Sequence, residues 1–263
     1  MIDEKVHMRI MQALRDVQDT ENVRILYACE SGSRGWGFES EDSDYDVRFI
    51  YVHRPGHYLR IQRQRDVIER PIDDILDVSG WDIIKALELF RRSNPPLLEW
   101  LQSPVVYLDE GILTQRLREL MKDYYSPVSC MYHYLHMAQN NFKEFLKKDQ
   151  VKYKKYFYVL RPVLACKWIQ AELGVVPIEF EKLLNELIPD GPLRQAIDKL
   201  LVMKRAGSEI DRGPQIPEIS DFLSTELERF ETEGIRPSET RELAKLDELL
   251  RDVLIEQFGN RII

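Results

Sequence analysis

The sequence predicts an α+β protein, in which a half built on a mixed β-sheet is followed by an all-helical half. Short runs rich in β-branched and aromatic residues occur only before about residue 110, whereas apolar residues at helical spacing dominate after it. We place the boundary near residue 120, which gives domains of residues 1–120 and 121–263. A chain of 263 residues is long enough to bury a core in each half.

The sheet half is expected to begin with an amphipathic helix over residues 3–18, where apolar side chains recur at helical spacing. Residues 23–29 and 45–52 are predicted to be strands, because both runs are short and rich in β-branched and aromatic residues. Residues 57–82 alternate weakly between apolar and polar, which suits one or two edge strands and then a strand near 74–79.

Capping and breaking signals predict the later elements. A helix is expected over residues 82–92, with Asp82 as its N-cap candidate, and "SNPPLLEWL" favours the start of another helix. A short closing strand is expected over residues 103–108. Residues 208–220 contain one glycine and two prolines, and they are predicted to be a loop within the helical half.

Composition and charge exclude several classes of protein. The three cysteines are far apart and show no metal-ligand spacing, so neither a disulfide framework nor a structural zinc site is expected. No apolar stretch approaches the ~20 residues that span a bilayer, and a secretory signal pattern is absent, so we expect a cytoplasmic protein without a membrane partner. The net charge of -8 argues against a broad nucleic-acid surface, although residues 143–167 hold eight Lys or Arg against two acidic residues.

Two small residues and two aspartates flank the connection between the predicted strands 23–29 and 45–52. Gly32 and Ser33 follow the first strand, where backbone N–H groups and a hydroxyl can contact an anion. Asp44 and Asp46 stand two apart at the start of the second strand, so their carboxylates point to the same side. Such like charges repel each other, and Mg²⁺ compensates them while it also binds substrate phosphates. The pattern predicts a site for a metal-bound polyphosphate.

Each part of this pattern also has a structural alternative. "SGSRG" is compatible with a flexible turn, and "SDYD" with a solvated entry into a strand. Consecutive strands are usually neighbours in a sheet, so the glycine turn and the aspartate pair are expected to meet at one end of it. The combination of the two parts therefore favours the metal site.

The order Gly32-Ser33, ten residues, Asp44-Tyr45-Asp46 resembles the Gly-Ser…Asp-x-Asp signature of the DNA polymerase β-type nucleotidyltransferase superfamily. Longer strings resemble one predicted group within it, the RNA-repair group often found beside RNA ligases, which includes YcgL-like proteins. These strings are "GSRGWGFESEDSDYDVRFIYV", "SGWDIIKALELFRRSNPPLLEWLQSPVVY" and "YFYVLRPVLACKWI". The resemblance covers about residues 25–185 and implies a polymerase β-type core followed by a helical domain.

The resemblance also implies a metal centre. In that superfamily the aspartate pair, here Asp44 and Asp46, and a third acidic residue from a later strand bind two Mg²⁺ (or Mn²⁺) ions. Asp77 is our choice for the third ligand, because it lies centrally in the predicted strand 74–79. Asp82 is the second choice, although it is better explained as a helix N-cap.

Further side chains are candidates for nucleotide binding. Gly32 and Ser33 would hold the β- and γ-phosphates. Arg34 is well placed to contact a phosphate, although a surface ion pair explains it equally well. Arg48 shares the strand face of the two aspartates, where it would either neutralise them or touch the substrate. Three further candidates within residues 143–167 share one helix face: Lys154, Tyr158 and Arg161. Alternatively, this face is simply solvated, or Pro162 disturbs the helix.

The resemblance implies an enzyme that transfers a nucleoside monophosphate from an NTP, such as ATP, to a hydroxyl and releases pyrophosphate. The family association suggests an RNA end as the acceptor, with the helical half closing over the nucleotide. Alternatives stay open: nucleotidylation of a protein or of a small molecule, or a non-catalytic module that binds nucleotide or RNA. The acceptor, the preferred base and the oligomeric state do not follow from the sequence.

Overall fold

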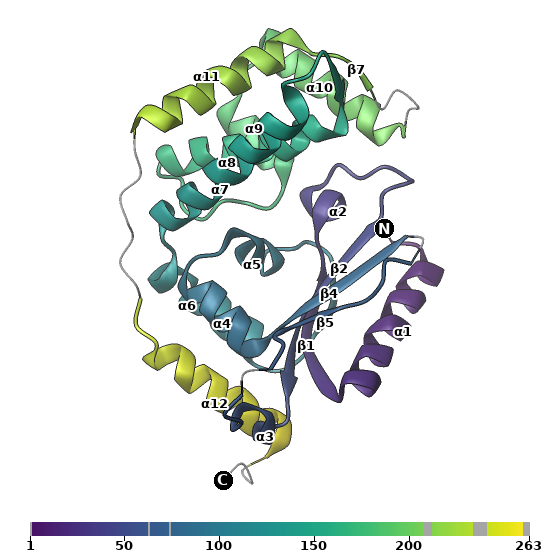
Figure 1. The fold of residues 1–263 in the computed structure, drawn as a ribbon, viewed down its shortest axis with the longest axis vertical. Coiled ribbons are helices and arrows are strands. Elements are labelled where there is room, and N and C mark those ends of the chain that lie inside the picture. Colours follow the sequence, from purple (N-terminus) through teal and green to yellow (C-terminus); the bar gives the residue numbers. More distant parts are fainter. Residues whose placement is uncertain (1, 63, 74, 208–211, 234–240, 260–263) are drawn as a thin grey trace. The chain divides into compact units, whose positions relative to one another are not determined.

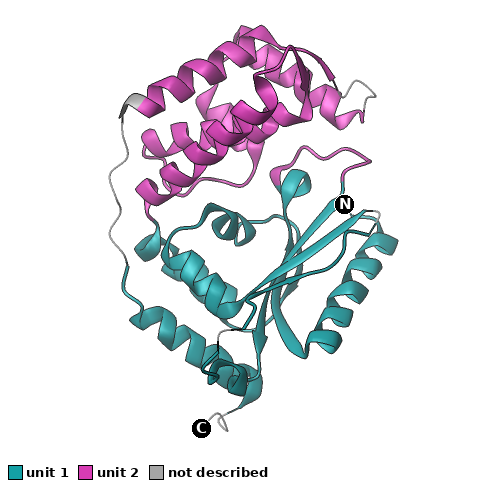
Figure 2. Ribbon diagram, viewed as in Figure 1, with its two compact units in different colours: residues 1–35, 44–125, 240–263 teal, residues 36–43, 126–239 magenta. Residues whose placement is uncertain are grey.

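The computed structural model describes residues 2–62, 64–73, 75–207, 212–233 and 241–259, which fall into two compact units. Unit 1 comprises residues 1–35, 44–125 and 240–263, and unit 2 comprises residues 36–43 and 126–239 (Figure 2). Unit 2 thus takes one segment from the first half of the sequence, and unit 1 takes the C-terminal segment. The domain boundary near residue 120 stays a prediction.

Unit 1 is built on a five-stranded mixed sheet with the strand order β3-β4-β2-β1-β5 (Figure 1). β1 is antiparallel to both β2 and β5, β4 is parallel to β2, and β3 is antiparallel to β4. The expected α+β class with a mixed sheet is therefore confirmed. The strands are β1 (Val23–Glu30), β2 (Tyr45–His53), β3 (Val67–Glu69), β4 (Leu76–Asp82) and β5 (Val106–Asp109).

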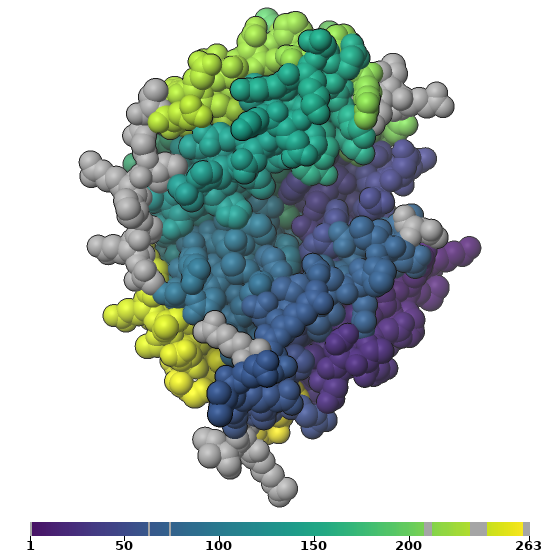
Figure 3. Space-filling model, in the orientation of Figure 1, coloured from purple at the N-terminus to yellow at the C-terminus, as the bar shows by residue number. Residues whose placement is uncertain are grey.

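Helices cover both faces of this sheet (Figure 1). α1 (Glu4–Glu21) packs on one face through Ile10, Leu14 and Val17, as the helical spacing predicts. α4 (Ile83–Arg91) and α5 (Pro95–Trp100) lie on the other face. α12 lies on the outside of unit 1, where its yellow atoms are visible in Figure 3. The other helices wholly or mostly in unit 1 are α2 (Gly32–Trp36), α3 (Pro55–Tyr58), α6 (Leu113–Tyr124) and α12 (Ala244–Phe258).

Alternation along β2 decides which of its side chains are available for chemistry. Val47 and Phe49 belong to the core that packs against α1, and both are fully buried. Because successive strand residues point to opposite faces, Asp46 and Arg48 point away from α1. Both are only partly buried there.

Unit 2 is helical apart from a short two-stranded ribbon, β6 paired with β7. α7 continues into the π-helical turn η1 and packs along α8, whose side chains are buried on most sides. None of the helices in the described residues combines the length and apolar content needed to cross a bilayer. The elements are α7 (Pro127–Asn141), η1 (Phe142–Leu146), β6 (Gln150–Lys152), α8 (Lys154–Gln170), α9 (Phe180–Leu187), α10 (Pro192–Arg205), β7 (Arg212–Pro214) and α11 (Pro217–Glu233).

Prolines account for most local errors of the sequence analysis. Pro55 starts α3, so residues 57 and 58 are helical where an edge strand was expected. Pro217 starts α11 inside the predicted loop 208–220, of which residues 208–211 lie outside the described residues, and β7 occupies a further part. Proline is tolerated in the first turn of a helix, where its missing N–H would have no partner. Pro162 lies inside α8, which continues through it.

Candidate active site

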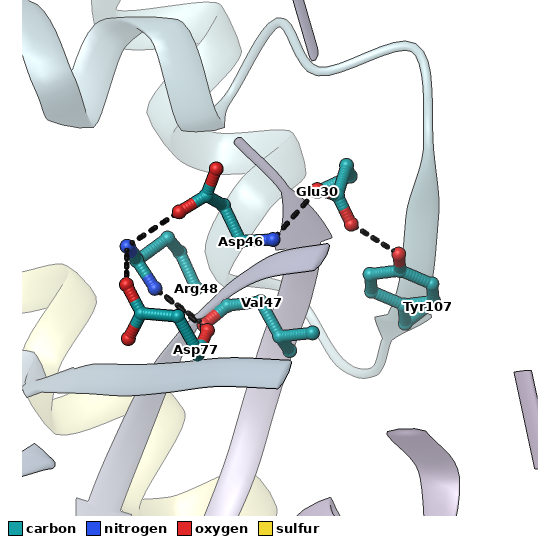
Figure 4. A network of polar contacts seen from close by, with 6 residues as sticks. All are labelled: Glu30, Asp46, Val47, Arg48, Asp77 and Tyr107. Atoms are coloured by element: carbon teal, nitrogen blue, oxygen red, sulfur yellow. Dashed lines mark hydrogen bonds and ion pairs between the residues drawn. The ribbon is translucent and has the colours of Figure 1, made fainter. Parts of the chain in front are cut away.

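Asp46 of β2 and Asp77 of β4 are direct neighbours in the sheet. The two strands are parallel, and their register pairs Asp46 with Asp77. Val47 and Val78, the residues that follow them, both belong to the core against α1, so both aspartates lie on the opposite face. Their side chains are 28% and 32% exposed. Two carboxylates from separate strands therefore converge on one place, as Figure 4 shows.

Arg48 lies between these two carboxylates (Figure 4). Its Nη2 is 3.1 Å from Oδ1 of Asp46 and 2.7 Å from Oδ2 of Asp77. Its Nη1 donates to the main-chain oxygen of Asp77 at 2.8 Å and to that of Val47 at 3.2 Å. Arg48 therefore holds the two aspartates and the backbone of β4 together, and it neutralises part of their charge.

The electrostatics of Asp46 suit a bound cation. Burial is the largest cause of its raised pKa; the Arg48 guanidinium opposes this, and the carboxylates of Asp77 and Asp44 add to it. Asp44 is exposed and precedes β2 by one residue. Among the described residues, no three His, Cys, Asp or Glu side chains are already grouped closely enough to hold a metal. The oxygen donors of Asp46 and Asp77 match the chemistry of Mg²⁺, and the role of Asp44 as a third ligand stays a prediction.

Gly32 is pressed against the carboxylate of Asp46. Its φ is +56°, and a Cβ at this position would lie 1.9 Å from Oδ2 of Asp46. Any side chain at residue 32 would therefore displace Asp46, so a glycine is needed here both for its conformation and for its size. The N–H of Ser31 donates to the main-chain oxygen of Asp46 at 2.9 Å. The glycine turn and Asp46 thus meet at one end of the sheet, as expected, and Ser33 follows in α2.

The sequence analysis missed Glu30, the last residue of β1. It is fully buried; its Oε1 accepts the N–H of Asp46 at 2.8 Å, and its Oε2 accepts the hydroxyl of Tyr107 (Figure 4). Burial raises the pKa of Glu30 to about 7, although both hydrogen bonds lower it. An acidic residue at the end of the mainly apolar run 25–29, next to a glycine turn, was the available signal. Glu30 fixes the backbone that carries Asp46.

Asp82 lies at the far end of β4. It is paired in register with Tyr51, five residues along from Asp77, which corresponds to about 17 Å of strand. Its carboxylate accepts the N–H of Ile84 at 2.8 Å and the hydroxyl of Tyr58 at 2.8 Å. Asp82 is therefore the N-cap of α4, which confirms this interpretation, and it is remote from Asp46.

Arg34 is placed over an aromatic ring. The centre of its guanidinium is 3.8 Å from the ring centroid of Tyr45, and its charge lowers the pKa of Glu30 and of Asp46. Arg34 thus adds positive potential at the end of the sheet where Gly32 and Asp46 meet. Its contact with a phosphate stays a prediction.

The three predicted nucleotide contacts on α8 do not share an exposed face. Lys154 and Tyr158 are exposed, whereas Arg161 is 1% exposed within unit 2. Nη2 of Arg161 donates to the main-chain oxygen of Ile178 at 3.3 Å, and its guanidinium lies 5.0 Å from the ring centroid of Trp36. The three residues align along α8, as their helical spacing predicts. At Arg161, however, α8 is covered by other residues of unit 2. The roles of the three residues in nucleotide binding stay predictions.

Comparison with known proteins relates the chain to a family, to a bacterial relative and to a solved structure. A sequence model of RlaP, described as the RNA repair pathway DNA polymerase beta family, matches residues 6–252. The "Uncharacterized protein YcgL" of Bacillus subtilis (strain 168) is 48% identical over 222 residues, which cover 84% of this chain and 85% of that protein. A crystal structure of a nucleotidyltransferase-like protein from Exiguobacterium sibiricum 255-15 is 13% identical and covers 95% of this chain and 90% of its own, with a TM-score of 0.31. A TM-score this low does not establish a shared fold.

Proposed function

Because the chain belongs to the RNA repair pathway DNA polymerase beta family, we propose that it is a metal-dependent nucleotidyltransferase that transfers a nucleoside monophosphate from an NTP to a hydroxyl. The observation that carries this proposal is the pairing of Asp46 with Asp77 on one face of the sheet, with Gly32 against Asp46. Paired carboxylates beside a small-residue turn suit a cation that also holds phosphate oxygens.

In this proposal Asp46, Asp77 and Asp44 bind Mg²⁺ or Mn²⁺. Two such ions, if bound by these residues, would lower the pKa of the attacking hydroxyl and stabilise the charge of the triphosphate. Arg48 keeps Asp46 and Asp77 side by side, as its contacts with both carboxylates indicate. Glu30 holds the backbone of Asp46 from the buried side. These residues position the phosphates and do not themselves form a covalent bond to the substrate.

The phosphates of the NTP are assigned to the turn between β1 and β2. Gly32 leaves the space that the Asp46 carboxylate occupies, Ser33 supplies a hydroxyl, and Arg34 supplies positive charge. In the reaction, the acceptor oxygen bonds to the α-phosphorus while the bond from this phosphorus to the bridging oxygen breaks. Pyrophosphate leaves with the electron pair, and the hydroxyl proton passes to the solvent.

We propose an RNA end as the acceptor, because the description of the family names an RNA repair pathway. The same site chemistry would serve an acceptor hydroxyl on a protein or on a small molecule. These alternatives differ only in what receives the label, so one assay separates them.

The test is incubation of the full chain with each of the four α-labelled NTPs, Mg²⁺ or Mn²⁺, and a panel of RNA ends, with cell extract as a second acceptor pool. We expect label on RNA, and none with Asp46→Asn or Asp77→Asn. Asp16→Asn, which alters an exposed aspartate of α1, is the matched control and keeps activity.

Equal labelling by wild type and both site variants would remove the assigned site. Label on protein or on a small molecule in the extract, with none on RNA, would replace the RNA acceptor and leave the chemistry in place. Binding of NTP without any transfer to any acceptor would favour the non-catalytic module.

A further inference from the structure

We propose that the surface of α7, η1 and the first turns of α8 binds a single strand of RNA. This inference rests on the proposed function, because it supplies a place for the acceptor away from the reacting end. We call its charged part the lysine segment, which is defined by Lys143, Lys147, Lys148, Lys152, Lys154 and Lys155.

The lysine segment reverses the overall charge of the protein. Its six lysines against Glu144 and Asp149 give residues 143–155 a formal charge of +4, so the rest of this -8 chain carries -12. Lys143, Lys147 and Lys148 are exposed. An acidic protein that concentrates cations in 13 residues has a local polyanion site instead of a general affinity for nucleic acid.

The stability of α8 does not explain why Lys154 and Lys155 lie at its start. Lys154 and Lys155 occupy the first turn of α8, which has no acidic residue. Cations at a helix N-terminus oppose the helix dipole and destabilise the helix. Residues that destabilise the local structure are expected at functional sites.

Aromatic side chains lie next to the charge. Nζ of Lys155 is 4.0 Å from the ring centroid of Phe145 in η1 and 4.6 Å from that of Tyr158 in α8. Tyr158 is 43% exposed, so part of its ring is open to solvent beside a cation. Bases of a single strand stack on such rings, while lysines contact the phosphates.

A groove on α7 continues this surface. It has a volume of about 500 Å³ and is lined by residues of one helix face, including Tyr132, His136 and Asn140. Tyr132 is 57% exposed and packs edge-on against His136 at 4.3 Å between ring centroids. At the end of the groove, Nδ2 of Asn141 lies 3.4 Å from the main-chain oxygen of Tyr158. The groove therefore ends beside the backbone of α8 at Tyr158.

These groups favour unpaired RNA over other polyanions. Rings, an imidazole and an amide in one groove can stack on bases and bond to their edges, and bases are accessible in this way only in a single strand. An anionic membrane would use the lysines but would leave the imidazole and amide groups of the groove unexplained. We therefore assign the surface to RNA and treat a membrane as an outcome of the test.

The test measures fluorescence anisotropy of a labelled 20-nucleotide single-stranded RNA with the full chain carrying Asp46→Asn, so that no transfer occurs during binding. Replacement of Lys147, Lys148 and Lys154 by Gln should weaken binding at least 10-fold. The slope of log affinity against log salt should become less steep by about 2, since each phosphate contact with a single strand contributes about 0.7.

Tyr158→Ala should weaken binding about 5- to 100-fold with an unchanged salt slope, because it removes stacking and no charge. The matched control replaces exposed lysines elsewhere, Lys5, Lys182 and Lys199, by Gln, and should bind as the parent does. Circular dichroism melting curves establish that every variant is folded.

Equal loss of affinity in the control variant, or no loss in the lysine-segment variant, would overturn the proposal. So would preferred binding to duplex RNA or to vesicles of phosphatidylcholine and phosphatidylserine. The two proposals fail separately. Lysine-dependent RNA binding without transfer by wild type would refute the proposed function, and RNA labelling with lysine-independent binding would refute the surface.

Discussion

Asp77 and Asp82 lie on the same strand, β4, and the structure uses them differently. Asp77 is partly exposed, lies beside Asp46 on the neighbouring strand, and shares Arg48 with it. Asp82 is 4% exposed, and its two oxygens accept the hydrogen bonds of Ile84 and Tyr58. A carboxylate with satisfied neutral partners stabilises a local structure, whereas carboxylates placed against each other create a demand for a cation.

The largest expected effect follows from removing a carboxylate of the pair. Asp46→Asn or Asp77→Asn should lower transfer activity by more than about 100-fold, since even the outer partners of metal ligands are worth about 10- to 100-fold. The melting temperature of Asp46→Asn should stay the same or rise, because burial disfavours the charge of the Asp46 carboxylate. Labelled-NTP assays and calorimetry measure the two quantities. A variant with near-normal activity would show that the pair is not catalytic.

Gly32→Ala tests whether the contact with Asp46 matters. We expect loss of activity comparable with Asp46→Asn, because the new Cβ would lie 1.9 Å from the Asp46 carboxylate. Gly37→Ala is the control: Gly37 also has a positive φ, of +85°, but no atom lies within 4 Å of its Cβ position. Both variants share a backbone cost of about 1 kcal/mol, visible in urea unfolding. Equal activity of the two variants would contradict a specific role for Gly32.

Asp82→Asn should alter the pH dependence of stability and spare activity. Burial raises the pKa of Asp82 to about 6, so the folded state holds its proton more tightly than the unfolded chain. The contribution of this proton to the free energy of unfolding is complete below about pH 4. This contribution, about 3 kcal/mol, is lost as the pH rises through 6.

Asp82→Asn lacks this pH-dependent loss of stability, because asparagine does not ionise. Between pH 4 and 7 its free energy of unfolding should therefore rise by about 3 kcal/mol relative to the wild type. Urea unfolding at several pH values measures this difference, and Asp16→Asn gives the baseline. Parallel curves for wild type and variant would show that Asp82 is ionised throughout the range. Loss of transfer activity at pH 7 in a folded variant would reopen Asp82 as a site residue.

The smallest effect is expected from Tyr107→Phe. It removes the hydroxyl that donates to Glu30 and leaves a buried carboxylate oxygen without this partner, at a cost of about 1–3 kcal/mol in the free energy of unfolding. Activity should fall less than for Asp46→Asn, since Glu30 still accepts the N–H of Asp46. Urea unfolding and the transfer assay, with the exposed Asp16→Asn as control, measure both. Unchanged stability would mean that Glu30 does not depend on Tyr107.

Much of the sheet and the meeting of Gly32 with Asp46 could be predicted from the sequence by local rules, whereas the choice of Asp77 also needed the resemblance to a known superfamily. Strand alternation places Asp46 opposite Val47, and consecutive strands bring Gly32 close to Asp46. Glu30 was missed because its function depends on Tyr107, 77 residues away, and no local pattern reports such a partner. The burial of Arg161 was missed for a similar reason. Helical spacing shows which residues share a face, but only the packed structure shows what covers it.

Segment 36–43 has a practical consequence for handling the protein in pieces. Phe38 in this segment stacks on Phe157 at 4.6 Å and meets Phe180 edge-on at 5.5 Å, all within unit 2. A fragment cut near residue 120 would release Phe38 into water and would leave the other fragment with an unfilled aromatic site. The second fragment would also carry away α12, whose apolar side chains are buried in unit 1. Expression as two separate fragments should therefore yield aggregates, whereas an intact chain, or both fragments produced together, should yield folded protein.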